Sequence, residues 1–307
     1  MGMIESTLSR PMAIAATAIA RPAYAVPGFS LSLGAVGRFL SKPATLIGVL
    51  VLAPMVILAL VAPVLPLPDA NAPDVRSALQ PPSMSHFFGT DKLGRDIFAR
   101  VLMGARVSLL IGFSVAAIAV VVGMALGMLS ATLGRGVDSA VMAVVDLLLS
   151  FPSLLLAIGF VAVFGAGVVQ VIVAIALADI PRAIRLQRSL ALGIRGRSYM
   201  DAARLFSAPT WWLICRHLLP NTIASMLVVG STYAANAILA EAALSFLGLG
   251  ITPPTPSWGN IISDGRRYLQ DGWWICTFPG VAIVLAAVSL HLLADGFRHS
   301  LDPRAEA

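Results

Sequence analysis

Residues 195–221 read RGRSYMDAARLFSAPTWWLICRHLLPN and lie between two long apolar runs, so a membrane helix is expected on each side. Ser198 and Asp201 are spaced as in a capping box, in which hydroxyl and carboxylate bond the free N–H groups at a helix start. Pro209 can open a second helical piece, and Pro220 can close it. The sequence therefore predicts two short helices here rather than a disordered connection.

This stretch resembles the EAA loop of the permease subunits of ATP-binding-cassette (ABC) importers. The matching positions are Asp201, Ala202, Ala203, Ser207, His217, Leu219 and Pro220. The resemblance implies that the first short helix is a coupling helix, which lies on the cytoplasmic face and sits in a cleft of an ATPase subunit. Ser198 and the matching positions are thus the predicted ATPase-coupling residues. The alternative is a generic basic cytoplasmic loop.

Two positions depart from the EAA pattern. Asp201 stands in place of Glu, which keeps the charge on a shorter side chain. Ser207 stands in place of Gly, and a left-handed turn at Ser costs on the order of 1 kcal/mol. Either the turn differs in this chain, or Ser207 caps the following helix instead.

The composition is that of an integral membrane protein. The chain has 307 residues, of which 58% are hydrophobic and 12% charged, with a mean hydropathy of +0.88. A soluble domain is about half apolar and one-quarter charged. The net charge of +6 does not indicate nucleic-acid binding, because the basic residues fall between apolar runs. No phosphate-binding loop and no catalytic or metal-ligand constellation is evident, so the chain is expected to be a non-enzymatic subunit without a metal site.

Hydropathy predicts an all-α protein with six transmembrane helices. The expected spans are about 43–66, 105–130, 138–163, 168–186, 222–243 and 274–295, the third interrupted by Pro152. The corresponding organisation is an N-terminal tail (1–42), a first helix with an outer loop (43–100), a permease core (101–296) containing the EAA loop at about 198–220, and a C-terminal tail (297–307).

The distribution of Lys and Arg sets the orientation. With both termini in the cytoplasm, 14 of the 21 basic residues fall on the inner side and 7 on the outer side. This bias agrees with the positive-inside rule for six spans.

Two outer segments are unusually rich in turn-forming residues. Gly89, Asp91, Gly94 and Asp96 precede the second span and suit a rigid lid or a docking surface. Residues 244–262 are rich in Gly and Pro, and non-helical backbone near membrane depth must be buried in protein or line an aqueous cavity. The second segment is therefore expected at the outer mouth of a pathway, or packed as a plug.

A longer resemblance covers about residues 43–304. It rests on FGTDKLGRDIFARVLMGARVSLLIGF (88–113), AILAEAALSFLGLGITPPTPSWGNII (237–262) and ADGFRHSLDPR (294–304). These stretches resemble the "C" permease subunit of dipeptide, oligopeptide and nickel importers. His291 and Ala294 stand where that family usually has Asn and Gly.

The resemblance implies a type I ABC importer permease fold in the inner membrane of a bacterium. It also implies a second permease subunit in a heterodimer, two ATP-binding subunits and an extracytoplasmic binding protein. ATP and magnesium belong to the ATP-binding subunits, and this chain is expected to bind no cofactor. Peptides are the expected substrate, with nickel or another small solute as the alternative.

Three acidic residues fall within the spans. Because a charge is costly there, each of these residues is a candidate for a functional role. Asp179 has Arg182 three residues later, which favours a local ion pair. Glu241 can bind a peptide amine or cap the following loop, and the structural role is favoured. Asp146 can satisfy backbone groups freed by Pro152, and is expected to face a partner or a cavity.

An ion-coupled secondary transporter remains an alternative class, although it should show inverted repeats. An intramembrane enzyme lacks a paired catalytic group.

Overall fold

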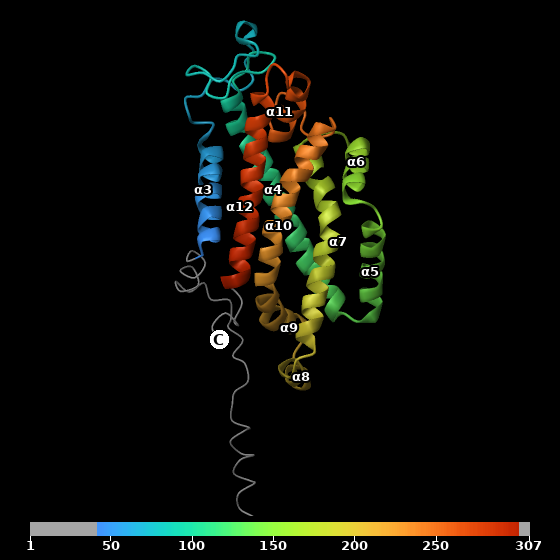
Figure 1. The fold of residues 1–307 in the computed structure, drawn as a ribbon. Helices are drawn as coiled ribbons and strands as arrows, with labels where there is room; N and C mark the ends of the chain where they lie inside the picture. Colours follow the sequence, from blue (N-terminus) through green and yellow to red (C-terminus); the bar gives the residue numbers. More distant parts are fainter. Residues whose placement is uncertain (1–41, 301–307) are drawn as a thin grey trace, which may run out of the picture. The chain divides into compact units, whose positions relative to one another are not determined.

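The computed structural model describes residues 42–300, so the predicted terminal tails lie almost wholly outside the described residues. The described part is helical and forms no extended strand (Figure 1). Its elements are α3 (Pro43–Val61), η1 (Val75–Ser77), α4 (Ile97–Thr132), α5 (Arg135–Leu149), α6 (Ser153–Phe164), α7 (Val168–Arg195), α8 (Ser198–Leu205), α9 (Thr210–Leu213), the π-helix η2 (Ile214–Leu218), α10 (Leu219–Phe246), α11 (Trp258–Gly265), η3 (Arg266–Tyr268) and α12 (Trp274–Ser300).

Within the described residues, four helices are long and apolar enough to cross a membrane: α3, α4, α12 and the continuous helix Thr210–Phe246. The pair α5 and α6 adds a fifth crossing if it forms one broken span. The predicted fourth span corresponds to α7, which is 28 residues long but carries Asp179 and several arginines. The all-α membrane fold is thus confirmed, and a separate sixth crossing by α7 stays a prediction.

The helix α4 lies at the centre of the bundle and packs against α3, α7 and α10. The backbone of α4 comes very close to α7. A Cβ atom added at Gly123 would overlap the Cβ of Ala183, and one added at Gly127 would lie 2.8 Å from the carbonyl oxygen of Ile184. Small residues permit this approach, as they do at many helix contacts in membranes. The sequence placed the start of this span near 105, but Asp96 accepts from the backbone N–H of Ala99 and starts the helix at Ile97.

The third predicted span is broken where Pro152 stands. The axes of α5 and α6 differ by 88° across residues 150–152. Proline lacks the N–H that would continue the ladder, and its ring disfavours helical backbone at the preceding residue. The predicted interruption is therefore confirmed as a sharp bend, with α5 and α6 both lying beside α7 (Figure 1).

The prediction that Pro220 closes a short helix is wrong. Pro209 stands at the N-cap of α9, and the chain then continues through η2 into α10 without a break. Pro220 lies in the first two residues of α10, directly after a π-helical turn. A π-helical turn shifts the register of the backbone hydrogen bonds, so the helix can include Pro220 without ending there. The fifth span is consequently much longer than the predicted 222–243.

Residues 62–96 and 247–273 form a loop cap at one end of the bundle. Within it the Asp91 carboxylate accepts from the Arg95 guanidinium at 2.6 Å, and Arg95 also reaches Asp264 of α11 at 3.4 Å. The indole of Trp258, which is fully buried, donates to the carbonyl of Val101 at 3.0 Å. Buried hydrogen-bonded charges and a buried aromatic side chain hold these segments together, and the rigid lid or docking surface that the turn-rich sequence suggests stays a prediction.

The close α4–α7 approach predicts that Gly123→Ala destabilises the protein. Overpacking costs about 1–3 kcal/mol, which outweighs the roughly 1 kcal/mol that Ala gains over Gly in a helix. Gly193→Ala is the matched control, since Gly193 lies in α7 with open space around its Cα. Thermal unfolding in detergent should show a lower midpoint for Gly123→Ala only. Equal midpoints for both variants would contradict the close approach.

Candidate functional site

The predicted coupling helix is present as α8, and one of its faces packs on the helix bundle. Met200 is 1% exposed and lies in an apolar cluster with the side chains of Tyr199 and Ala203. The other buried members come from the adjoining ends of α4, α7 and the α9–η2 segment: Ala131, Ala191, Ile194, Leu213 and Leu218. The helix α8 is therefore packed against three elements of the bundle at once.

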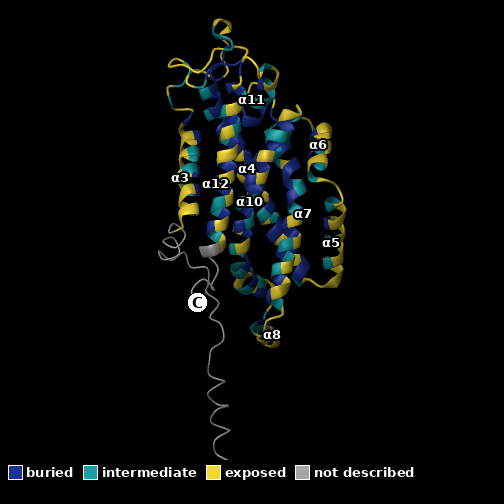
Figure 2. Ribbon diagram, viewed as in Figure 1, coloured by how far each residue is buried: buried dark blue, intermediate teal, exposed yellow. Residues whose placement is uncertain are grey.

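The opposite face of α8 is open. Asp201 and Ala202 are exposed, and at the C-terminal end Leu205 and Phe206 are 85% and 88% exposed. Figure 2 shows α8 projecting from the end of the bundle. The described chain therefore leaves two large apolar side chains uncovered at the end of α8.

The start of α8 differs from the predicted capping box. The helix already includes Ser198, and the carbonyl of Arg197 accepts from the backbone N–H groups of Met200 and Asp201. Arg197 therefore holds the N-cap position that the spacing assigned to Ser198. The start of the helix is shifted by one residue because only Gly196 and Arg197 separate the end of α7 from the start of α8.

Both alternatives for Ser207 are wrong. Ser207 has φ +57°, so the left-handed turn is kept although the residue is not glycine. The N–H of Ala208 bonds the carbonyl of Ala203 at 3.2 Å, which is the long bond of a Schellman motif with Ser207 at the left-handed position. Pro209, not Ser207, stands at the N-cap of α9.

The end of the EAA-like pattern lies against α8. The ring of His217 contacts Trp212 and Tyr199, with centroids 5.0 and 5.7 Å apart, and so links η2 to α8. Leu219 packs against the main core, and Pro220 lies at the start of α10. The structure thus brings His217 to the predicted coupling helix and leaves Leu219 and Pro220 in the adjoining span.

Glu241 is completely buried at the junction of α10 with the loop cap. Its carboxylate accepts from the hydroxyls of Ser245 at 2.7 Å, Ser257 at 2.8 Å and Ser108 at 3.2 Å. The same hydroxyls hold backbone N–H groups, since Ser108 accepts from Trp258 and Ser245 accepts from Ile251. The carboxylate therefore orders the loop cap through these three hydroxyls. It is not exposed at the surface of the described residues.

The other two acids pair with arginines of α7. Asp179 accepts from Arg182 at 2.8 Å, which is the ion pair that the spacing predicts. Asp146 pairs with Arg185 and does not bond the backbone around Pro152, where the Ser150 hydroxyl instead donates to Leu147.

Sequence reasoning missed a third pair of the same kind. Arg188 donates both Nε and Nη2 to the carboxylate of Asp138, at 2.5 and 2.6 Å, and the hydroxyl of Ser130 donates to the same group at 2.5 Å. These three residues come from α7, α5 and α4. The sequence does contain a signal for this pair: arginines stand at every third position, 182, 185 and 188. This spacing places a row of charges along one side of a helix.

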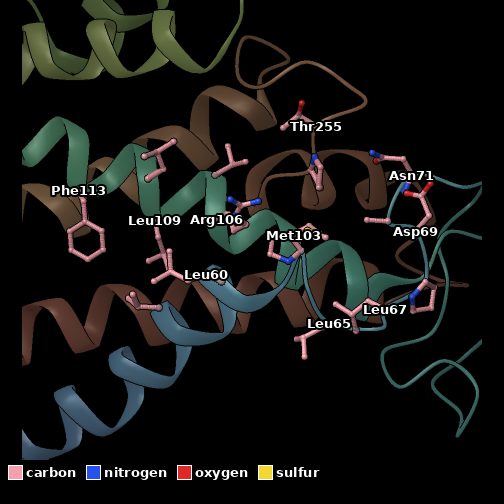
Figure 3. Close-up of a pocket in the computed structure, with 18 residues that line it drawn as sticks. Leu60, Leu65, Leu67, Asp69, Asn71, Met103, Arg106, Leu109, Phe113 and Thr255 are labelled. Atoms are coloured by element: carbon pink, nitrogen blue, oxygen red, sulfur yellow. The ribbon is translucent and has the colours of Figure 1, made fainter.

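An open pocket of about 640 Å³ lies between α3, α4 and the loop cap (Figure 3). Its walls are mainly apolar, with the Arg106 guanidinium among them. None of the predicted site residues lines it, so this pocket is separate from both α8 and the ion pairs of α7.

Comparison with known proteins identifies the family. Residues 120–307 match the family described as "Binding-protein-dependent transport system inner membrane component". This range contains α8, the ion pairs of α7 and Glu241. The chain belongs to this family. It is a multi-pass inner-membrane permease component of an ABC transport system.

Curated relatives extend the similarity over most of the chain. A putative peptide transport system permease protein of Brucella suis is 45% identical over 87% of this chain and 90% of its own length. A probable D,D-dipeptide transport system permease protein of Escherichia coli K12 is 42% identical over 86% and 89%. A dipeptide transport system permease protein of Alkalihalophilus pseudofirmus is 36% identical over 85% and 86%.

Proposed function

We propose that this chain is a permease subunit of an ATP-driven importer for short peptides and forms half of the translocation pathway beside a second permease subunit. The names of the relatives, which refer to peptide or dipeptide transport, support a peptide substrate. Two ATP-binding subunits carry ATP and magnesium, and an extracytoplasmic binding protein delivers the peptide. This chain binds no cofactor of its own.

The observation that carries the proposal is the two-sided character of α8. One face is packed on the ends of α4, α7 and the α9–η2 segment, and the other presents exposed Leu205 and Phe206. An ATP-binding subunit that seats on the exposed face moves the packed face with it. ATP shifts the transporter between states only because the complex binds ATP more tightly in one of them.

In the orientation we propose, both termini and α8 lie in the cytoplasm. Cys215 is exposed beside α9 and reports the side on which this loop lies. In a Cys276→Ser background, an impermeant maleimide added to intact cells should leave Cys215 unlabelled, and permeabilisation should expose it. Labelling of Cys215 in intact cells would reverse the orientation.

The coupling role predicts different effects for neighbouring alanines. Ala202→Trp places a large ring on the exposed face and should abolish association with the ATP-binding subunits without changing the amount of protein in the membrane. Asp201→Lys should weaken association as well, since it leaves charge unpaired at the interface and opposes the helix dipole. Ala203 packs on the bundle, so Ala203→Trp should disturb the loop itself.

The matched control is Ser207→Gly, which removes a left-handed serine and should retain full association and uptake. The measurements are membrane level, co-purification of the ATP-binding subunits and uptake of a labelled dipeptide. Normal uptake by both Ala202→Trp and Asp201→Lys would refute the coupling role of α8.

A further inference from the structure

The pocket between α3, α4 and the loop cap has an apolar side and a polar side. Figure 3 shows Leu60, Leu109 and Phe113 towards one end of the pocket. Asp69 and Asn71 lie together towards the other end. The volume of about 640 Å³ is within the range of small-molecule sites, which are mostly apolar and carry a few polar groups. The pocket therefore suits a ligand that is apolar at one end and polar at the other.

Arg106 lies between these two sides, and within residues 42–300 its guanidinium makes no hydrogen bond or ion pair. Asp69 is the acidic residue of the pocket, but it accepts from the backbone N–H of Asn71 at 2.9 Å and does not pair with Arg106. An arginine without an acidic partner is suited to a phosphate, because its planar fork can donate two parallel charge-assisted hydrogen bonds to phosphate oxygens.

The pocket lies where an apolar helix ends. Both α3 and α4 are long and apolar enough to cross a membrane, and α3 ends at Val61, shortly before Asp69 and Asn71. The side chains of Leu60 and Leu110 are 69% and 55% exposed, so the apolar surface continues out of the pocket over both helices. A membrane lipid has the same sequence of groups, with long apolar chains followed by a charged headgroup.

We propose that this pocket binds a glycerophospholipid that carries an amine in its headgroup, such as phosphatidylethanolamine. The lipid phosphate pairs with Arg106, the ammonium group lies beside Asp69, and the acyl chains follow α4 towards Phe113. Basic pockets between membrane helices are suited to lipid headgroups in this way. The assignment depends neither on the transported solute nor on the coupling role of α8.

The order of the charged groups favours a lipid over a protein surface as the occupant. The occupant must place an anion at Arg106, a cation near Asp69 and apolar groups on the other side of the anion. A phospholipid with an amine headgroup carries these three parts in this order, and it leaves no net charge in the pocket. Arg106 and Phe113 are separated by roughly 10 Å of helix, which gives the acyl chains about two turns of α4 to contact.

The test is photocrosslinking of a lipid to the chain, purified together with the subunits that accompany it and placed in nanodiscs. The probe is a trace of phosphatidylethanolamine that carries a diazirine on an acyl chain close to the glycerol. Labelled residues are mapped by mass spectrometry of peptides. The bulk lipid is a mixture of phosphatidylethanolamine and phosphatidylglycerol.

Two variants with matched controls address the two sides of the pocket. Leu60→Trp narrows the apolar side, and Leu50→Trp is its control, because Leu50 lies in the same helix and is 62% exposed but does not line the pocket. Arg106→Gln removes the cation. Arg267→Gln is its control, because Arg267 is an exposed arginine of η3 that lies outside the pocket.

Labelling should concentrate on residues 56–67 and 103–113. It should fall roughly tenfold in Arg106→Gln, the effect expected for losing hydrogen bonds to a charged group, and by a similar factor in Leu60→Trp. Neither control should change it. Even labelling of the apolar helix surfaces that is unchanged in both variants would overturn the inference and indicate ordinary boundary lipid. Absence of labelling in the pocket would also overturn it and assign this face to another subunit.

The headgroup is tested separately with unlabelled lipids as competitors. Phosphatidylethanolamine should compete with the probe better than phosphatidylglycerol, because only the former offers a cation to Asp69. Asp69→Asn should remove this preference, since asparagine keeps an oxygen for the N–H of Asn71 but loses the charge. Equal competition by both lipids in the unmodified protein would contradict the assignment of the amine to Asp69.

Discussion

The arrangement of this protein depends on the pairing of the charges of α7. The helix α7 carries Arg182, Arg185 and Arg188 along one side. Each has a carboxylate partner, and the pair between Arg188 and Asp138 is bidentate. Because Asp138 also accepts from Ser130 of α4, this one carboxylate fixes α5 against two neighbours.

Packing between α4 and α7 then connects the ion pairs of α7 to α8, the proposed coupling helix. The glycines of α4 bring its backbone against Ala183 and Ile184, so the two helices are closely packed along this contact. Their ends, together with the α9–η2 segment, form the apolar cluster that holds Met200 of α8. A displacement of α8 would therefore act on the same helix that carries Arg182, Arg185 and Arg188.

Much of the fold could be predicted from the sequence, since long apolar runs and Pro152 determine helices and a break locally. The membrane-spanning character, the bend at Pro152 and the Asp179–Arg182 pair follow from composition and short spacing. Helix ends were less predictable, because the start of α4 depends on a cap at Asp96 and the start of α8 on its short connection to α7.

Other features depend on residues far apart in the chain. Asp138 is 50 positions from Arg188, and Glu241 collects hydroxyls from residues 108, 245 and 257. Spacing along one helix could not find these groups. The left-handed backbone of Ser207 was also missed, because packing of Ala203 and Ala208 on the bundle holds a turn that serine alone disfavours.

A double-mutant cycle on Asp138 and Arg188 tests the central claim most directly. The free energy of unfolding in mixed detergent is measured for Asp138→Asn, Arg188→Gln and the double variant. Each single variant should lose about 1 kcal/mol, because the pair is bidentate but its two side chains are 30% and 26% exposed to solvent. The double variant should lose clearly less than the sum, with a coupling energy of about 0.5 kcal/mol or more. Additive losses would contradict the account, since they would mean that the two charges do not hold α5 and α7 together.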